Sequence, residues 1–137
     1  MTKKILCATD GSKHSEHAVQ FAGELAGRLG VDLAVCVVNI ARGSARTPII
    51  YSLEDADVKA ILDAAAAMAR KAGGKAVSEV ALRSRDAAAA VVQYAEENGY
   101  DHIITGTGDK HGVSRLVLGS VAADIASRAH CTVTIAR

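Results

Sequence analysis

The sequence predicts a three-layer α/β/α domain, Rossmann-like, in which helices cover both faces of a five-stranded parallel sheet. Short apolar runs alternate along the chain with segments of helical period, and the central runs are apolar on both sides, as in strands buried on both faces. Aromatic residues make up only 3% of the chain, so the core must consist of small aliphatic side chains that let helices lie close to a sheet. A length of 137 residues suits one domain spanning residues 1–137.

The first half of the chain predicts two strands and two helices. Lys4–Thr9 and Leu33–Val38 are apolar runs of strand length, and Gly30 ends the helix between them. The inner face of that helix carries Ala18, Phe21, Ala22, Leu25 and Leu29. Ala41–Ser52 contains the only proline and is expected to be an irregular binding loop or lid. A second helix follows, with Val58, Ile61, Leu62, Ala65, Ala69 and Ala72 on one face, and ends at Gly73-Gly74.

The second half predicts three strands and two helices. Val77–Leu82 is a strand, and Asp86 starts a helix whose inner face holds Ala87, Val91, Tyr94 and Ala95. His102–Thr105 is the next strand, and a glycine-rich loop runs from Gly106 to Gly119. The last elements are a helix from Ser120 to Ala129 and a strand from Cys131 to Ala136.

The C-terminal strand alternates apolar and polar residues, which is typical of a sheet edge. Its unpaired backbone groups favour a homodimer joined through Cys131–Ala136. The alternative, an edge that is simply hydrated, remains open.

Composition excludes several classes of protein. A formal net charge of +1 provides no field to attract nucleic acid or an anionic membrane, and no apolar run approaches the length of a membrane span. The three cysteines, Cys7, Cys36 and Cys131, lie in apolar runs without a Cys-x-x-Cys motif, and no signal peptide precedes Lys3. We therefore expect a cytoplasmic protein whose thiols are small buried hydrophobes.

Two loops follow strands at the edge of the sheet where ligands bind in open parallel folds. The first is Ala8–Ser12, and Lys13 and His14 behind it favour an anion nearby, although both also suit a solvated surface. The second is Gly106–Ser120, which is rich in glycine and opens a helix, a place where backbone N–H groups attract phosphate. Ser120 either donates to that phosphate or caps the helix.

The sequence contains no recognisable catalytic machinery. It lacks a Gly-x-Ser-x-Gly elbow, a phosphate-binding loop ending in Gly-Lys-Ser/Thr and a Gly-x-Gly-x-x-Gly after the first strand. His14 and His17 share a helical face, but a third metal ligand is not evident, and His102 and His130 are expected to make local hydrogen bonds. His111 is the histidine to test for phosphate contact. We expect a binding module rather than an enzyme.

The chain resembles the universal stress protein family. The similarity lies in the opening Ile5–Ser12, with Ser15 and Ala18, and in Asp101–Gly106, Ser114–Ala122 and Cys131–Ile135. ATP-binding members carry Gly, two residues, Gly, nine residues, then Gly-Ser or Gly-Thr. Here Gly106 and Gly119-Ser120 match that motif, and Asp109 occupies the place of the second glycine. Asp109 either repels a polyphosphate or holds Mg²⁺ against it.

The resemblance implies a sheet order of 3-2-1-4-5, a dimer through the fifth strand, and a site for ATP, ADP or AMP, with Mg²⁺. By matched position, Asp10 would lie near the ribose and a metal, with Ala8 and Thr9 beside the nucleoside. Slow ATP hydrolysis, with Asp10 and a metal activating water, is an open alternative to binding alone. The remaining contacts would be Val38 to the adenine, Thr105 to ribose and base, and Gly106, Asp109, Gly119, Ser120 and Val121 at the phosphates.

The function expected from this resemblance is adenine nucleotide binding that orders the Gly106–Gly119 loop and alters how the dimer meets another protein during stress. The alternative is a dimeric interaction protein that has lost nucleotide binding through Asp109. A flavoprotein subunit of related fold is a third alternative, which the scarcity of aromatic residues disfavours.

Overall fold

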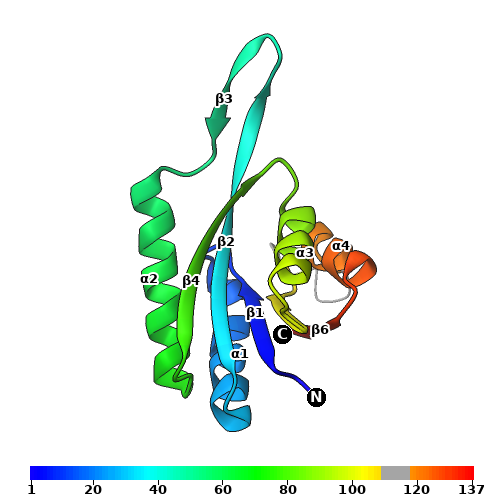
Figure 1. The fold of residues 1–137 in the computed structure, drawn as a ribbon. Coiled ribbons are helices and arrows are strands. Elements are labelled where there is room, and N and C mark those ends of the chain that lie inside the picture. The colour runs from blue at the N-terminus through cyan, green and yellow to red at the C-terminus, as the bar shows by residue number, and fades with distance from the viewer. Residues whose placement is uncertain (109–117) are drawn as a thin grey trace.

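The computed structural model of the chain describes residues 1–108 and 118–137. They form a three-layer α/β/α fold, which confirms the predicted class (Figure 1). In chain order the elements are β1 (Lys4–Ala8), α1 (Lys13–Leu29), β2 (Asp32–Ser44), β3 (Thr47–Tyr51), α2 (Asp55–Ala72), β4 (Val77–Ser84), α3 (Ala87–Glu97), β5 (His102–Gly106), α4 (Ser120–Arg128) and β6 (Thr132–Ala136).

The sheet of the described residues has six strands, so the predicted count of five was wrong. Five strands pair in parallel, β4 and β1 with β2, β5 with β1, and β6 with β5, which reproduces the expected order 3-2-1-4-5 among them. The sixth strand, β3, is antiparallel to the end of β2, and the sheet path runs β3-β2-β1-β5-β6 with β4 also on β2.

The expectation of an irregular loop at Ala41–Ser52 is corrected by this hairpin. β2 continues to Ser44, well beyond Val38, and β3 returns beside it (Figure 1). The base of the hairpin is held by Asn39, a buried side chain whose amide donates to the Leu53 carbonyl at 2.8 Å and accepts from the Leu53 N–H at 2.9 Å. Both polar ends of this buried amide are therefore satisfied, and the chain is directed from β3 into α2.

Two apolar layers fill the space between the sheet and its helices. One lies under α1 and α2 and includes Ile5, Val35 and Ile104, and the other lies under α3 and α4 and includes Leu6, Cys36 and Ile103. Successive residues of a strand point to opposite faces, so each buried strand contributes to both layers. This explains why the runs are apolar on both sides.

The helix predictions hold with adjusted ends. Ser12 accepts a hydrogen bond from the Ser15 N–H at the start of α1, Gly30 ends it, and Asp86 caps α3 by accepting from the Ala89 N–H. The inner face predicted for α1 was partly wrong, because Phe21 is 39% exposed and Leu29 is 47% exposed. The buried face consists mainly of small residues, because α1 packs closely on both the sheet and α2.

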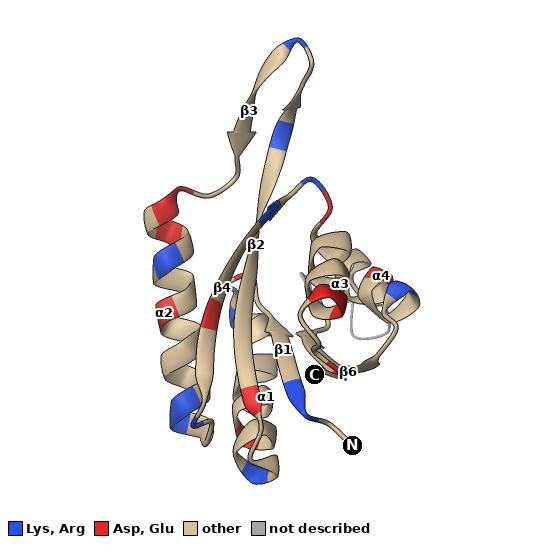
Figure 2. Ribbon diagram, viewed as in Figure 1, with Lys and Arg blue, Asp and Glu red and all other residues tan. Residues whose placement is uncertain are grey.

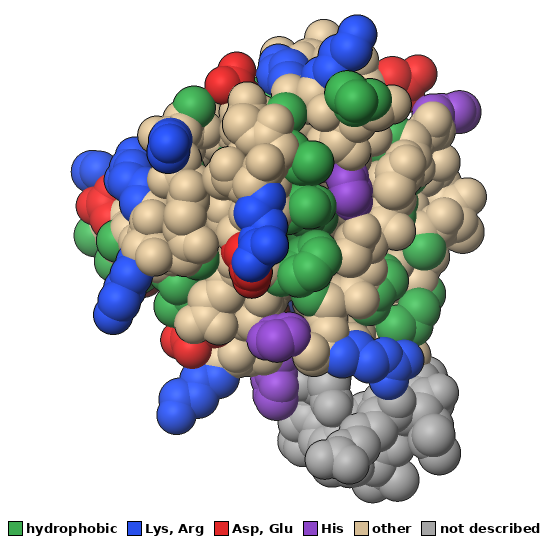
Figure 3. Space-filling model, turned by 90° about the horizontal axis from the view of Figure 1, so that it is seen from below, with side chains coloured by type: hydrophobic (Ala, Val, Ile, Leu, Met, Phe, Trp, Pro, Cys, Tyr) green, Lys and Arg blue, Asp and Glu red, His purple; other side chains and the backbone are tan. Residues whose placement is uncertain are grey.

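Charges are spread over the surface. Figure 2 shows both acidic and basic residues on α2, with acidic ones at its start and basic ones at its end, and on the face seen in Figure 3 both signs are present. Within the described residues, no helix is both long enough and apolar enough to cross a bilayer.

Candidate functional site

The site lies at the carboxyl ends of β1 and β5, which are neighbours in the centre of the sheet. The chain leaves β1 for α1 on one face of the sheet, and α4, which follows β5 along the chain, lies on the other face. The connections therefore part at this point, as they do at the switch point where open parallel sheets bind ligands.

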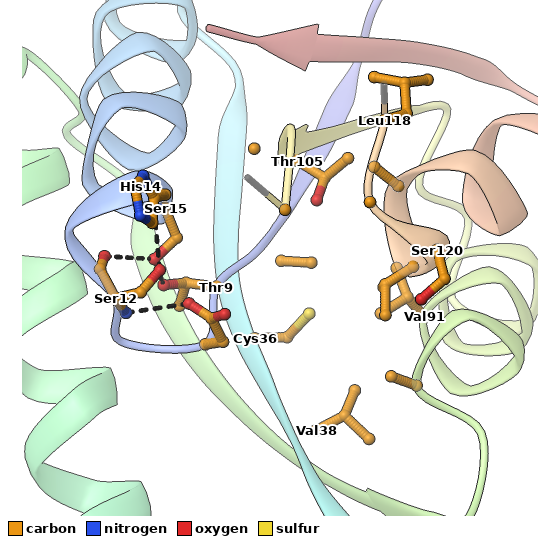
Figure 4. Close-up of a pocket in the computed structure, with 18 of the residues that line it drawn as sticks. Thr9, Ser12, His14, Ser15, Cys36, Val38, Val91, Thr105, Leu118 and Ser120 are labelled. Carbon is orange, nitrogen blue, oxygen red and sulfur yellow. Dashed lines mark hydrogen bonds between the residues drawn. The ribbon is translucent and has the colours of Figure 1, made fainter. Parts of the chain in front are cut away.

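A cavity of about 740 Å³ opens between these connections. Its size falls within the range typical of small-molecule sites, about 300–1,000 Å³. In Figure 4 the polar groups of the loop after β1 lie on one side and Ser120 with Val91 on the other. The lining consists of Ala8, Thr9, Asp10, Ser12, His14, Ser15, Cys36, Val38, Ile40, Ala87, Val91, Thr105, Gly106, Gly108, Leu118, Gly119, Ser120, Val121 and Ala122.

The structure brings nine of the ten sequence-predicted site residues into this lining, namely Ala8, Thr9, Asp10, Val38, Thr105, Gly106, Gly119, Ser120 and Val121. Asp109, the tenth, lies outside the described residues, as do Lys110, His111 and Ser114.

Sequence reasoning missed part of the lining. Cys36 and Ile40 stand two residues on either side of Val38, so the period-two alternation of a strand would have placed them on the same face. Ala87 and Val91 are one helical turn apart on α3 and form the opposite wall. No local signal identifies that wall, because it depends on how α3 packs against the sheet.

A directed chain of hydrogen bonds runs through the hydroxyl groups of the first loop (Figure 4). The Ser15 hydroxyl donates to the Ser12 carbonyl at 2.8 Å, so the 2.7 Å contact between Thr9 Oγ1 and Ser15 Oγ must be donated by Thr9. Thr9 Oγ1 in turn accepts from the Gly11 N–H at 3.2 Å. Because its proton is used in the hydrogen bond to Ser15, the Thr9 hydroxyl can only accept a hydrogen bond from a ligand.

Asp10 supplies negative charge at the rim of the cavity. Its Oδ1 accepts a hydrogen bond from the Ser12 N–H at 2.9 Å. Burial pushes the pKa of Asp10 upward, but hydrogen bonds from Ser12 outweigh it and leave the pKa below its usual value. The carboxylate is therefore ionised at neutral pH and can accept hydrogen bonds from hydroxyl groups or contact a cation.

The amino end of α4 supplies the opposite polarity. The first helical hydrogen bond runs from the Ala123 N–H to the Gly119 carbonyl at 3.0 Å. The N–H groups of Ser120, Val121 and Ala122 come before it and have no acceptor within the helix. Gly119 occupies the N-cap, and the alternative that Ser120 caps the helix is wrong because Ser120 is the first helical residue. The Ser120 hydroxyl lines the cavity instead.

The glycines around this loop are also required by the chain itself. A Cβ on Gly119 would lie 2.9 Å from Gly108 Cα and 3.0 Å from the Thr107 carbonyl oxygen. Gly108 has φ +71°, in the left-handed region that glycine favours. The Gly119 N–H donates to the Thr107 carbonyl at 2.7 Å, so the described residues just before 109 and just after 117 are in contact.

The remaining wall is apolar. Val38, Ile40 and Val91 form much of it, together with Cys36. Burial raises the pKa of the Cys36 thiol to about 12, so Cys36 is an uncharged, unreactive part of the wall. Burial raises the pKa of the Cys7 thiol as well. Cys131 is only half-buried, so the expectation of three buried thiols holds for Cys7 and Cys36 alone.

His102, outside the cavity, makes local hydrogen bonds. His102 bonds Thr2 Oγ1 through Nδ1 at 3.2 Å and Thr134 Oγ1 through Nε2 at 2.7 Å, which confirms its local hydrogen-bonding role. Burial lowers the pKa of His102. Among residues 1–108 and 118–137, no three potential metal-binding side chains come together, so a cation at Asp10 would need ligands from a bound anion.

Comparison with known proteins places this cavity in a family context. The model of the universal stress protein family matches residues 1–137. A universal stress protein of Methanocaldococcus jannaschii is 32% identical over 98% of this chain and 82% of its own length. Among solved structures, a universal stress protein in complex with cAMP has a TM-score of 0.79 and 27% identity, covering 99% of this chain and 97% of that one. An Archaeoglobus fulgidus universal stress protein in complex with dAMP has a TM-score of 0.74 and 26% identity, covering 98% of both chains.

Proposed function

This chain belongs to the universal stress protein family, and we propose that it binds an adenine nucleotide in the cavity between β1, β5 and α4. The observation that carries the proposal is the separation of three chemistries around one cavity: an ionised carboxylate, the amino end of a helix and an apolar wall. Relatives of 27% and 26% identity were solved with cAMP and dAMP, which supports the choice of ligand.

Each part of a nucleotide has a matching surface. The α4 N–H groups and the Ser120 hydroxyl suit phosphate oxygens, because the amino end of a helix attracts anions. Asp10 accepts hydrogen bonds from ribose hydroxyls, and the Thr9 hydroxyl accepts a further one. Val38 and Val91 present apolar surface to the flat faces of the base.

ATP with Mg²⁺ is the form we favour. Asp10 is an ionised oxygen ligand of the kind that Mg²⁺ accepts, and the other ligands would come from phosphate oxygens and water. Asp109 replaces the glycine of the ATP-binding motif and either joins the metal or repels the phosphates. The second of these outcomes gives the alternative function, a dimeric interaction protein that binds no nucleotide.

The nucleotide would act through the protein's surface. We propose that its binding changes the segment Gly106–Gly119 and, through it, the contacts of a homodimer joined along β6 with another protein of a stress response. Among the described strands β6 pairs with β5 alone, and a second copy could pair with its other edge. Unchanged hydrogen exchange across residues 106–119 on nucleotide addition would contradict this coupling.

Calorimetric titration tests the binding itself. ATP with Mg²⁺, ATP without metal, AMP and cAMP are titrated into the purified protein and into the Asp109→Gly variant. Saturable binding by the unaltered protein supports the nucleotide proposal. If only the glycine variant binds, Asp109 closes the site and the nucleotide-free function is adopted. If neither binds, the cavity does not serve adenine nucleotides.

A further inference from the structure

The hairpin formed by the end of β2 and by β3 projects from the body of the domain (Figure 1). All five residues of β3 are exposed, and Ile49, Ile50 and Tyr51 are 57%, 66% and 37% exposed. A two-stranded hairpin is at best marginally stable by itself in water, and apolar residues clustered on a free strand edge invite pairing with another chain. The hairpin is therefore a candidate contact surface.

The hydrogen-bonding register shows which backbone groups remain available. The Ser52 N–H donates to the Ile40 carbonyl at 2.9 Å, and Arg42 pairs with Ile50. Residues of an antiparallel strand alternate between facing the partner and facing away. The backbone groups of Ile50 therefore point toward β2, and those of Ile49 and Tyr51 point outward.

The features that limit edge pairing fall in one half of β3. Pro48 and the register shift between Arg42 and Ser44 lie in the half of β3 nearer the turn, whereas Ile50 and Tyr51 keep their regular pairing with Arg42 and Ala41. Charge, another device that prevents edge pairing, is absent from Thr47–Tyr51.

We propose that β3 pairs antiparallel with β3 of a second copy of this chain, with the two Ile50 residues facing each other on a two-fold axis. This contact goes beyond the proposed nucleotide function and is separate from the β6 edge. With the axis at Ile50, Ile49 forms hydrogen-bonded pairs with Tyr51 of the second copy, and Tyr51 with Ile49.

The side chains in this register are complementary. The Ile50 pair is non-hydrogen-bonded, the type in which side chains approach most closely. On each side, an isoleucine faces a tyrosine, a favourable combination of β-branched and aromatic residues. The Tyr51 ring is already positioned by Arg83, whose guanidinium carbon lies 4.6 Å from the ring centroid.

The charges beyond the strand are complementary as well. The turn before β3 carries Arg46 and α2 begins after it with Glu54 at the N-cap, so antiparallel pairing puts the basic turn of one copy at the same end as the acidic start of α2 of the other. Figure 2 shows the basic tip of the hairpin and the acidic start of α2 at opposite ends of β3. This arrangement favours a second copy over an unrelated partner, because a two-fold axis repeats the same pairing of opposite charges at both ends of the contact.

Cysteine cross-linking tests the register. In a Cys131→Ser background, Ile50→Cys places two thiols on the axis at a Cα separation of about 4.5 Å, within the range for a disulfide. Ile49→Cys is the matched control, since it is adjacent and similarly exposed but faces residue 51. We expect Ile50→Cys to form disulfide dimers at least about tenfold faster than Ile49→Cys under mild oxidation. An equimolar mixture of Ile49→Cys and Tyr51→Cys should form the mixed dimer.

Sedimentation provides a measurement that does not depend on oxidation. Ile50→Glu places like charges opposite each other and should halve the mass of the assembly relative to the unaltered chain. Leu29→Glu, which changes an exposed leucine on α1, should leave that mass unchanged. Equal rates of cross-linking by Ile50→Cys and Ile49→Cys would overturn the proposal. An assembly mass that does not change with Ile50→Glu would also overturn it, and this is the result expected if β3 contacts an unrelated protein instead.

Discussion

Gly23 of α1 lies directly against the backbone of Ala69 of α2. A Cβ on Gly23 would lie 2.8 Å from Ala69 Cα and nearer still to the Ala69 carbonyl oxygen. One turn later, Gly27 makes the same kind of approach to Gly73. The two helices on this face of the sheet are therefore packed at a spacing that only a missing side chain allows.

The Gly23→Ala variant should be less stable by about 1–3 kcal/mol, because one methyl group forces α1 and α2 apart in a packed layer. Chemical denaturation measures the free energy of unfolding. Gln20→Ala, on the exposed side of the same helix, is the control and should change it by less than about 0.5 kcal/mol. Equal stability of Gly23→Ala and the unaltered protein would mean that the helices separate without cost.

The Asp10→Asn variant should bind adenine nucleotide about 10- to 100-fold more weakly, because hydrogen bonds to a charged acceptor contribute about 1.5–3 kcal/mol. Titration with AMP in the absence of metal isolates the contact to the sugar, and titration of ATP with and without Mg²⁺ measures the contact to the metal. Asp32→Asn, on an exposed residue at the start of β2, serves as the control. An affinity unaffected by Asp10→Asn would remove Asp10 from the site.

Val38→Phe should reduce nucleotide affinity by at least about tenfold by filling the apolar side of the cavity. The matched control is Leu82→Phe, because Leu82 is the partner of Val38 across β2 and β4 but does not line the cavity. Both variants should retain a cooperative unfolding transition. Binding that survives Val38→Phe would place the base elsewhere.

The stability of the fold should depend on Asp101 in acid. Asp101 accepts hydrogen bonds from the backbone N–H groups of Lys3 and Lys4 at 3.0–3.1 Å. Burial raises the pKa of Asp101, but these bonds outweigh it and lower the pKa overall. Because the folded-state pKa is depressed, the contribution is present above the unfolded-state value of about 3.9 and is lost as the pH falls through the folded-state pKa.

The measurement is the unfolding free energy of the unaltered protein and of Asp101→Asn as a function of pH. The gap between them should be constant above about pH 5 and should close in stronger acid. A gap that widens on acidification would contradict the assigned direction of the shift.

Much of the architecture could be predicted because it depends on local pattern. The alternation of apolar runs with helical segments, Gly30 after α1 and Asp86 before α3 are all readable from neighbouring residues. The cavity was located for a similar reason, since the loops after β1 and β5 follow the two central strands of a parallel sheet.

The hairpin was missed because its signals are weak or misleading. Its turn contains Ala45-Arg46 rather than the Asn-Gly or Asp-Gly pairs that mark tight hairpins, and Pro48 argues against a strand. The ladder tolerates Pro48 because the register shifts between Arg42 and Ser44. The α3 wall of the cavity was missed because tertiary packing alone positions Ala87 and Val91.

The clamp between Asn39 and Leu53 makes the hairpin a separable module. Ile40 and Ser52 are already joined by a backbone hydrogen bond, so residues 41–51 begin and end at neighbouring points of the sheet. A two-residue turn could close the same gap, and a foreign hairpin or peptide could be inserted there, without moving Val38 or the start of α2. The domain can therefore be regarded as a scaffold in which an exchangeable arm is attached beside the wall of the cavity.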